Sequence, residues 1–295
     1  MLGKNLKVHF VDTGLTNQLD ELVALITGDV HYMLYSCFPY INKKKHSYVD
    51  NYDIPKLLHQ FNHVIQDSGL FTLMFGAKRN QKLTYEDLVE WQDRLIQFVQ
   101  ENNIDATCVE VDAQKLIGAE KTWKLRERMD KLLKNRQIHV FHLEDGKYGL
   151  DRLIEYSDYI AISVPELRIH RRKTYVQDVH NLATYIKKKK PGIDIHLLGC
   201  TEFKILAQNT FCTSSDSNSW MQGIMYGTHR QFGKAKHISQ FKRHLIDSYE
   251  KKILLTSGMI PWQPSTPKTY DNTKRECVMA RSCKEQYALC VGDQE

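Results

Sequence analysis

The chain has 295 residues, of which 42% are hydrophobic and 26% are charged, so it can bury the core of one large domain or of a domain with a small appendage. It has no run of about 18 apolar residues, which argues against a membrane-spanning helix. The net charge of +6 comes with several lysine and arginine clusters. Such clusters suit a polyanionic partner, although solvation of an ordinary surface is the simpler explanation of each single cluster.

The seven cysteines are scattered along the chain, which is typical of reduced thiols rather than of a disulfide framework. Cys37, Cys108 and Cys200 lie in apolar runs and are expected to be small core residues. The first residues lead directly into a strand pattern without an apolar secretory segment. We therefore expect a cytoplasmic protein.

Short apolar runs of β type recur along the chain and are separated by segments with helical period. The predicted strands are 8–11, 32–37, 63–66, 107–111, 138–141, 159–163, 195–199 and 210–214. The clearest helical face is formed by Leu88, Trp91 and Leu95, after a helix start at Thr84. Alternating strands and helices predict a mainly parallel sheet, and eight such units in roughly 250 to 300 residues predict a (β/α)8 TIM-type barrel.

Two alternatives to a regular barrel stay open. The first two strand–helix units are the least regular and could hide an antiparallel insertion. An open doubly wound sheet is the competing architecture, but no Gly-x-Gly-x-x-Gly turn follows the first strand, so a dinucleotide site is unsupported.

The pattern changes after residue 228. A helical stretch at 237–253 is followed by a Pro/Ser/Thr-rich segment at 261–273 and by a basic tail that contains cysteines. We therefore predict a barrel over residues 1–228 and a C-terminal extension over 229–295, in which a helix and the basic tail pack on the barrel.

Catalytic groups of such barrels lie at the carboxyl ends of the strands. Those ends carry Asp67, Asp112, His142 with Glu144 nearby, Ser163 with Val164, Gly199 with Cys200, and Asp216. A pair of carboxylates is the standard equipment for cleaving a glycosidic bond, one as nucleophile and one as proton donor.

Each candidate also has a purely structural interpretation. Asp67 stands before Ser-Gly and could cap a turn, and Asp216 could cap a helix over 218–226. Asp112 could form a surface ion pair with Lys115, and His142 could be a satisfied core histidine.

The segment Asp67-Ser68-Gly69-Leu70-Phe71 resembles the Asp-Ser-Gly-Gly-Phe segment of the tRNA-guanine transglycosylase family. Residues 109–112 are similar to the family's strand that ends in a base-reading aspartate, and 195–199 are similar to its seventh strand. Asp216 then falls where the family keeps its nucleophile. The surrounding Ser-Ser-Asp-Ser-Asn-Ser-Trp most resembles the DNA-directed branch, the phage and bacterial deazapurine DNA-modification transglycosylases of the DpdA family.

The resemblance covers residues 8–227 in order, with three departures. Leu70 and Thr72 replace a glycine and a glutamine, and His142 stands where the family has a base-reading glutamine. The Cys-x-Cys-x2-Cys zinc ligands of the tRNA enzymes are not reproduced. Here Cys277, Cys283 and Cys290 are more widely spaced. Free thiols are the simpler expectation, and a structural zinc that recruits His237 or His244 is the alternative; no metal or other cofactor is expected to be required.

The resemblance implies a DNA guanine transglycosylase that exchanges guanine for a 7-deazaguanine of the preQ0 type through a covalent aspartyl–deoxyribosyl intermediate. Asp216 would be the nucleophile and Asp67 the acid and base. The expected substrate-binding residues are Asp112, Ser68, Gly69, Phe71, His142, Ser163, Val164 and Gly199. The expected contacts to DNA phosphates are Lys43, Lys44, Lys45, Lys78, Arg79, Arg168, Arg171, Arg172 and Lys173.

Three other functions fit the same residues. The chemistry could act on tRNA, a hydrolytic glycosylase could use the same carboxylates, or a non-catalytic barrel could only bind nucleic acid.

Overall fold

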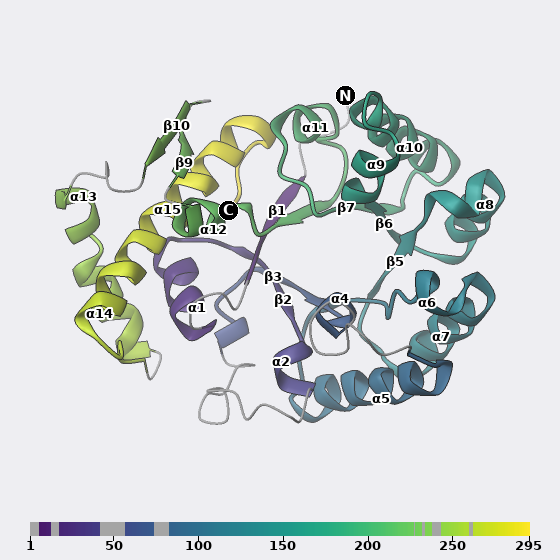
Figure 1. The fold of residues 1–295 in the computed structure, drawn as a ribbon, viewed down its shortest axis with the longest axis horizontal. Coiled ribbons are helices and arrows are strands. Elements are labelled where there is room, and N and C mark those ends of the chain that lie inside the picture. The colour runs from purple at the N-terminus through teal and green to yellow at the C-terminus, as the bar shows by residue number, and fades with distance from the viewer. Residues whose placement is uncertain are drawn as a thin grey trace. The chain divides into compact units, whose positions relative to one another are not determined.

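The computed structural model describes residues 6–12, 18–41, 57–73, 83–226, 228–231, 234–237, 243–259 and 262–295. Eight parallel strands close into a barrel in the order β1 to β8 (Figure 1), which confirms the predicted (β/α)8 architecture. A separate antiparallel pair, β9 Thr228–Gln231 and β10 Lys234–His237, was not predicted.

The observed strands match the predicted runs closely except at the eighth. The barrel strands are β1 Lys7–Val11, β2 Tyr32–Ser36, β3 His63–Asp67, β4 Thr107–Val109, β5 Gln137–Phe141, β6 Tyr159–Ser163, β7 Asp194–Leu198 and β8 Ser214–Ser217. The eighth begins where the predicted run ends, because the apolar residues before it form a turn. Its polar residues enter the ladder by pairing in parallel with β1, so backbone pairing outweighs the low apolar content of Ser214–Ser217.

Backbone contacts divide the chain into two compact units. Unit 1 comprises Met1–Met33, Lys56–His63 and Gly199–Glu295, and unit 2 comprises Leu34–Pro55 and Val64–Leu198. A domain boundary at residue 228 stays a prediction. Cys37, Cys108 and Cys200 are fully buried, as their apolar surroundings predict.

In unit 1 the long helix α15 organises the packing. The helices of this unit are α1 Gln18–Thr27, α11 Phe203–Gln208, α12 Ser219–Tyr226, α13 Arg243–Asp247, α14 Glu250–Met259 and α15 Pro267–Val291. Helix α15, yellow in Figure 1, packs against α1, α11 and α12. Beyond it, the Gln294 side chain accepts a hydrogen bond from the Val8 N–H at 2.8 Å, so the chain end is tied to β1.

The Pro/Ser/Thr-rich segment at 261–273 and the basic tail after it contribute to one long helix that the sequence analysis did not predict. Thr266 caps α15 by accepting a hydrogen bond from the Thr269 N–H at 3.1 Å, and Pro267 occupies the first helical position. Both residue types favour a helix start, so this segment begins a helix of 25 residues.

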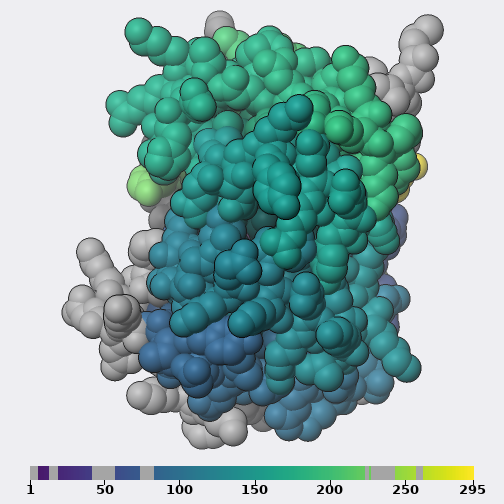
Figure 2. Space-filling model, turned by 90° about the vertical axis from the view of Figure 1, so that its right-hand side faces the viewer, coloured from purple at the N-terminus to yellow at the C-terminus, as the bar shows by residue number. Residues whose placement is uncertain are grey.

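In unit 2 the helices cover the outer face of β3 to β7. They are α2 Phe38–Ile41, α4 Leu70–Thr72, α5 Tyr85–Glu101, α6 Gln114–Ile117, α7 Ala119–Leu132, α8 Gly146–Tyr156, α9 Val164–His170 and α10 Tyr175–Lys189, with a 3-10 turn η3 at Leu143–Asp145. Figure 2 shows their outer layer, from α5 in blue to α8 and α10 in teal. Thr84 and Asp87 form a capping box at the start of α5, and the predicted face of Leu88, Trp91 and Leu95 is buried.

Among the described helices, none combines the length and apolarity that crossing a membrane requires.

Candidate active site

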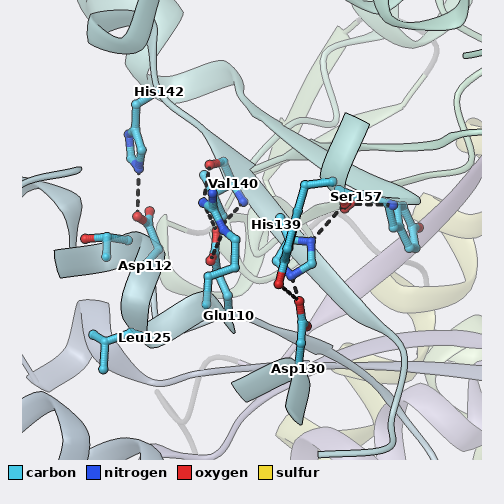
Figure 3. A network of polar contacts seen from close by, with 12 residues as sticks. Glu110, Asp112, Leu125, Asp130, His139, Val140, His142 and Ser157 are labelled. Atoms are coloured by element: carbon cyan, nitrogen blue, oxygen red, sulfur yellow. Dashed lines mark hydrogen bonds and ion pairs between the residues drawn. The ribbon is translucent and has the colours of Figure 1, made fainter. Parts of the chain in front are cut away.

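The carboxyl ends of β4, β5 and β6 bring four charged side chains of unit 2 together. Asp112 follows β4 and His142 follows β5, and His142 Nε2 lies 2.7 Å from Asp112 Oδ1 (Figure 3). On the other side of the ring, Nδ1 lies 3.6 Å from Glu166 Oε2, an electrostatic contact longer than a hydrogen bond. Lys115 Nζ lies 3.1 Å from Glu166 Oε1. We call Asp112, His142, Glu166 and Lys115 the polar quartet.

Charge alternates along the polar quartet. Burial opposes protonation of His142, but Asp112 and Glu166 outweigh it and raise the pKa of His142 to about 10. Burial would raise the pKa of Glu166, but His142 and Lys115 outweigh it and lower that pKa to about 2. His142 is therefore an imidazolium at neutral pH and Glu166 a carboxylate, so a neutral ligand can bind beside them without leaving a net charge buried.

A fully buried ion pair holds together the strands that carry Asp112 and His142. Arg126 of α7 holds both oxygens of Glu110 at 2.7 Å, and the Val140 N–H donates to Glu110 Oε1 at 2.6 Å (Figure 3). Burial would raise the pKa of Glu110, but Arg126 holds it below its usual range. These bonds tie the end of β4 to β5, and therefore fix the backbone that carries Asp112 and His142.

A serine–histidine–aspartate series also lies in unit 2, but it is structural. His139 Nδ1 lies 2.8 Å from Ser157 Oγ, and its Nε2 lies 3.2 Å from Asp130 (Figure 3). Ser157 is buried, and its hydroxyl donates to the Tyr159 carbonyl at 2.9 Å. Because the hydroxyl proton is donated to this carbonyl and not to His139, the histidine does not act as a base for the serine.

Asp67 is the last residue of β3, as the sequence predicts. Its Oδ2 accepts a hydrogen bond from the Gly69 N–H at 2.9 Å, so the carboxylate does shape the following turn. Gly69 has φ +71°, and a Cβ there would lie 2.9 Å from Phe38, which explains why the turn contains glycine. The Ser68 carbonyl accepts from Trp91 Nε1 at 2.9 Å, and Phe71 is 72% exposed.

Asp216 belongs to unit 1 and lies within β8 rather than after it. Its Oδ1 accepts a hydrogen bond from the Gly199 N–H at 2.8 Å, and the residue is buried. The structure therefore brings together two predicted site residues, Asp216 and Gly199. The Ser219 N–H, in the first turn of α12, donates a hydrogen bond to Ser217 Oγ at 3.1 Å.

The predicted residues after β6 begin α9. Ser163 Oγ accepts from the Glu166 N–H at 3.4 Å as a helix cap, and Val164 is buried. The predicted phosphate contacts Arg168, Arg171, Arg172 and Lys173 are all exposed. The other predicted phosphate contacts, Lys43, Lys44, Lys45, Lys78 and Arg79, lie outside the described residues.

Sequence reasoning missed Glu166 and misassigned Lys115. It allowed Lys115 as the partner of Asp112, whereas Asp112 pairs with His142 and Lys115 with Glu166. The series Ser163-Val164-Pro165-Glu166 has the spacing of a helix-capping motif directly after a strand, and that signal could have drawn attention to Glu166.

Metal-binding residues do not gather in the part of the chain that the structure describes, where no group of three or more His, Cys, Asp or Glu side chains could hold an ion. Cys277, Cys283 and Cys290 lie along α15, and Cys290 Sγ is 3.4 Å from the Phe203 carbonyl oxygen. Comparison with protein-family models and with curated proteins finds no match.

Proposed function

We propose that this protein is a DNA guanine transglycosylase, which replaces guanine in DNA by a 7-deazaguanine base of the preQ0 type. The observation that carries the proposal is the Asp216 carboxylate in β8, buried and oriented by the Gly199 N–H at 2.8 Å. A second carboxylate, Asp67, ends β3. Catalytic groups at strand ends are the rule for closed parallel barrels, and the motif around each aspartate resembles the transglycosylases.

The first half of the reaction opens the glycosidic bond. Asp216 attacks C1′ of the deoxyribose, the C1′–N9 bond breaks, and its electron pair leaves with guanine, which takes a proton from Asp67. The Gly199 N–H holds one Asp216 oxygen and so aims the carboxylate at the sugar. The target nucleotide has to leave the helical stack first, because C1′ is shielded in a duplex.

The second half reverses these steps with the incoming base. Asp67 takes the N9 proton of the deazaguanine, N9 attacks C1′, and Asp216 departs as a carboxylate. Two displacements at one carbon retain its configuration.

Asp112 is proposed to select the base. An ionised carboxylate can accept hydrogen bonds from the N1–H and the 2-amino group of guanine, a pair of donors that adenine lacks. His142 Nε2 lies 2.7 Å from Asp112 Oδ1 and so orients this carboxylate. Both nitrogens of His142 face carboxylates, so the quartet supports a role for His142 in orienting Asp112 more than a direct contact to the base.

The test is incorporation of a radiolabelled 7-deazaguanine into duplex DNA, single-stranded DNA or bulk tRNA. We expect label in DNA only, and none with Asp216→Ala. Asp105→Asn, which changes an exposed carboxylate before β4, is the matched control and should incorporate normally. Exchange retained by Asp216→Ala would eliminate the nucleophile assignment.

The same experiment separates the other functions. Label in tRNA alone identifies a tRNA enzyme. Abasic sites that form without an incoming base identify a hydrolytic glycosylase. Binding of DNA without exchange of any deazaguanine tested identifies a non-catalytic barrel.

A further inference from the structure

Exposed apolar side chains are distributed unevenly over unit 2. Its most exposed large apolar residues are Tyr148 at 84%, Phe71 at 72% and Ile169 at 69%. Each lies in a helix that directly follows a strand, namely α8 after β5, α4 after β3 and α9 after β6. In the described part of this unit the other exposed large apolar residues, Leu132 and Tyr156, are less exposed and lie at the ends of α7 and α8, before the next strand begins.

The positions of the three residues place them along one edge of the unit 2 sheet. β3, β4, β5 and β6 are parallel neighbours, so their carboxyl ends share that edge (Figure 1). Tyr148 follows His142 by six residues, and Ile169 follows Glu166 by three. Tyr148 and Ile169 therefore stand close in sequence to members of the polar quartet, and Phe71 follows the neighbouring strand β3.

Positive charge accompanies these side chains. Arg168, Arg171, Arg172 and Lys173 surround Ile169 between the start of α9 and the start of α10, and all are exposed. We call Phe71, Tyr148, Ile169 and these four cations the rim surface. An aromatic ring offers a face on which any base can stack, and neighbouring cations neutralise phosphates, which together is the chemistry of single-stranded nucleic-acid binding.

We propose that the rim surface binds the single-stranded stretch of DNA around the extruded nucleotide, with Tyr148 and Phe71 stacking on unpaired bases and Ile169 filling the space beside them. Exposing large apolar groups to water costs free energy. A partner with π faces and negative charge would cover the apolar side chains and neutralise the cations of this edge at once. The inference deepens the proposed function, because it names the form of DNA that the barrel holds.

The experiment measures DNA affinity without any incoming base, so it is independent of base exchange. Fluorescence anisotropy with a labelled single strand of about 16 nucleotides compares wild type with Tyr148→Ala, Tyr148→Phe and Ile169→Ser. We expect Tyr148→Ala to weaken binding about tenfold, which corresponds to ~1.4 kcal/mol, and Tyr148→Phe to stay within about twofold because its ring still stacks. Leu132→Ser removes an exposed apolar side chain from the other end of the unit and should bind like wild type.

The salt dependence tests the cations separately. Replacing Arg171 and Arg172 together by Ala should reduce the slope of log K against log salt by about 1.4, since each phosphate contact on a single strand contributes about 0.7. All substituted positions are exposed, so we expect the fold to be retained, and circular dichroism of each variant checks this.

Wild-type affinity in a Tyr148→Ala/Ile169→Ser double variant overturns the proposal. Concentration-dependent self-association that this double variant abolishes, with DNA affinity unchanged, also overturns it and assigns the edge to a protein interface. If wild-type protein does not exchange bases in DNA but the rim variants lose DNA affinity as expected, the proposed function is wrong and the rim surface is still supported. If wild-type protein exchanges bases and the rim variants bind DNA like wild type, the proposed function is supported and the rim surface is wrong.

Discussion

Two aspartates of the proposed site, the base-binding candidate Asp112 and the candidate nucleophile Asp216, are held in different ways. Asp112 accepts a hydrogen bond from a charged imidazolium, which a second carboxylate and a lysine hold in turn. Asp216 accepts one from the backbone N–H of Gly199. An ion pair fixes charge and direction and so suits recognition, whereas a neutral backbone donor orients a carboxylate with less loss of its nucleophilicity. Under the proposed function, this difference fits base recognition by Asp112 and bond formation by Asp216.

Replacing each aspartate by asparagine tests most directly whether Asp112 and Asp216 have different roles. Asp216→Asn preserves an acceptor for the Gly199 N–H but removes the nucleophile, so exchange should fall by about 10³-fold or more. Asp112→Asn should instead act mainly through KM for the incoming base and relax discrimination against adenine. Steady-state kinetics and trapping of the covalent DNA complex measure both. If both variants reduced trapping of the covalent DNA complex equally, the separate roles proposed for Asp112 and Asp216 would be wrong.

The buried Glu110–Arg126 ion pair, which fixes the backbone before Asp112, should cause the largest loss of stability when one partner is removed. Arg126→Met leaves Glu110 charged and buried without its partner, so the free energy of unfolding should fall by about 3–5 kcal/mol. Urea denaturation measures the loss. The double variant Glu110→Gln/Arg126→Met removes both charges and should recover part of it; a double variant as unstable as the single one would contradict an electrostatic origin.

The turn after Asp67 offers a test at a glycine. Gly69→Ala adds strain at φ +71° and a contact of 2.9 Å with Phe38, so it should destabilise the protein by about 1–3 kcal/mol. Gly192→Ala, at a glycine with open space around it and no positive φ, is the control and should be close to wild type. Thermal unfolding measures both variants, and wild-type stability of Gly69→Ala would contradict the strained turn and the close approach of Phe38.

The charge of His142 predicts a pH dependence with a defined sign. Its pKa is raised from 6.5 to about 10 by the flanking carboxylates, so its contribution to stability is fully present below about pH 6.5 and is lost as the pH rises through about 10. Glu166→Gln should lower this pKa and shift the loss to lower pH. NMR titration of the His142 ring and urea unfolding between pH 6 and pH 10 measure both effects. The same His142 titration in Glu166→Gln as in wild type would show that Glu166 does not raise the pKa of His142.

Much of the site could be predicted from the sequence because strand ends are visible as breaks in apolar runs. In this way the sequence predicts Asp67 at the end of β3, His142 directly after β5 and Asp112 shortly after β4. It does not reveal Glu166, which lies inside helix α9, because only the fold brings that side chain back to His142. The alternative of a Lys115–Asp112 ion pair is wrong because Lys115 reaches Glu166, and sequence distance does not reveal which carboxylate a long flexible side chain reaches.

The amino-acid sequence alone determined the alternation of strands and helices, because apolar periodicity reflects which face of each element is buried. It also determined which residues stand at the strand ends. Only the tertiary structure decided the charge state of His142, the burial of the Glu110–Arg126 pair and the long C-terminal helix that packs on α1. These features depend on groups far apart in the chain, whose mutual distances and shared exclusion of water exist only after folding.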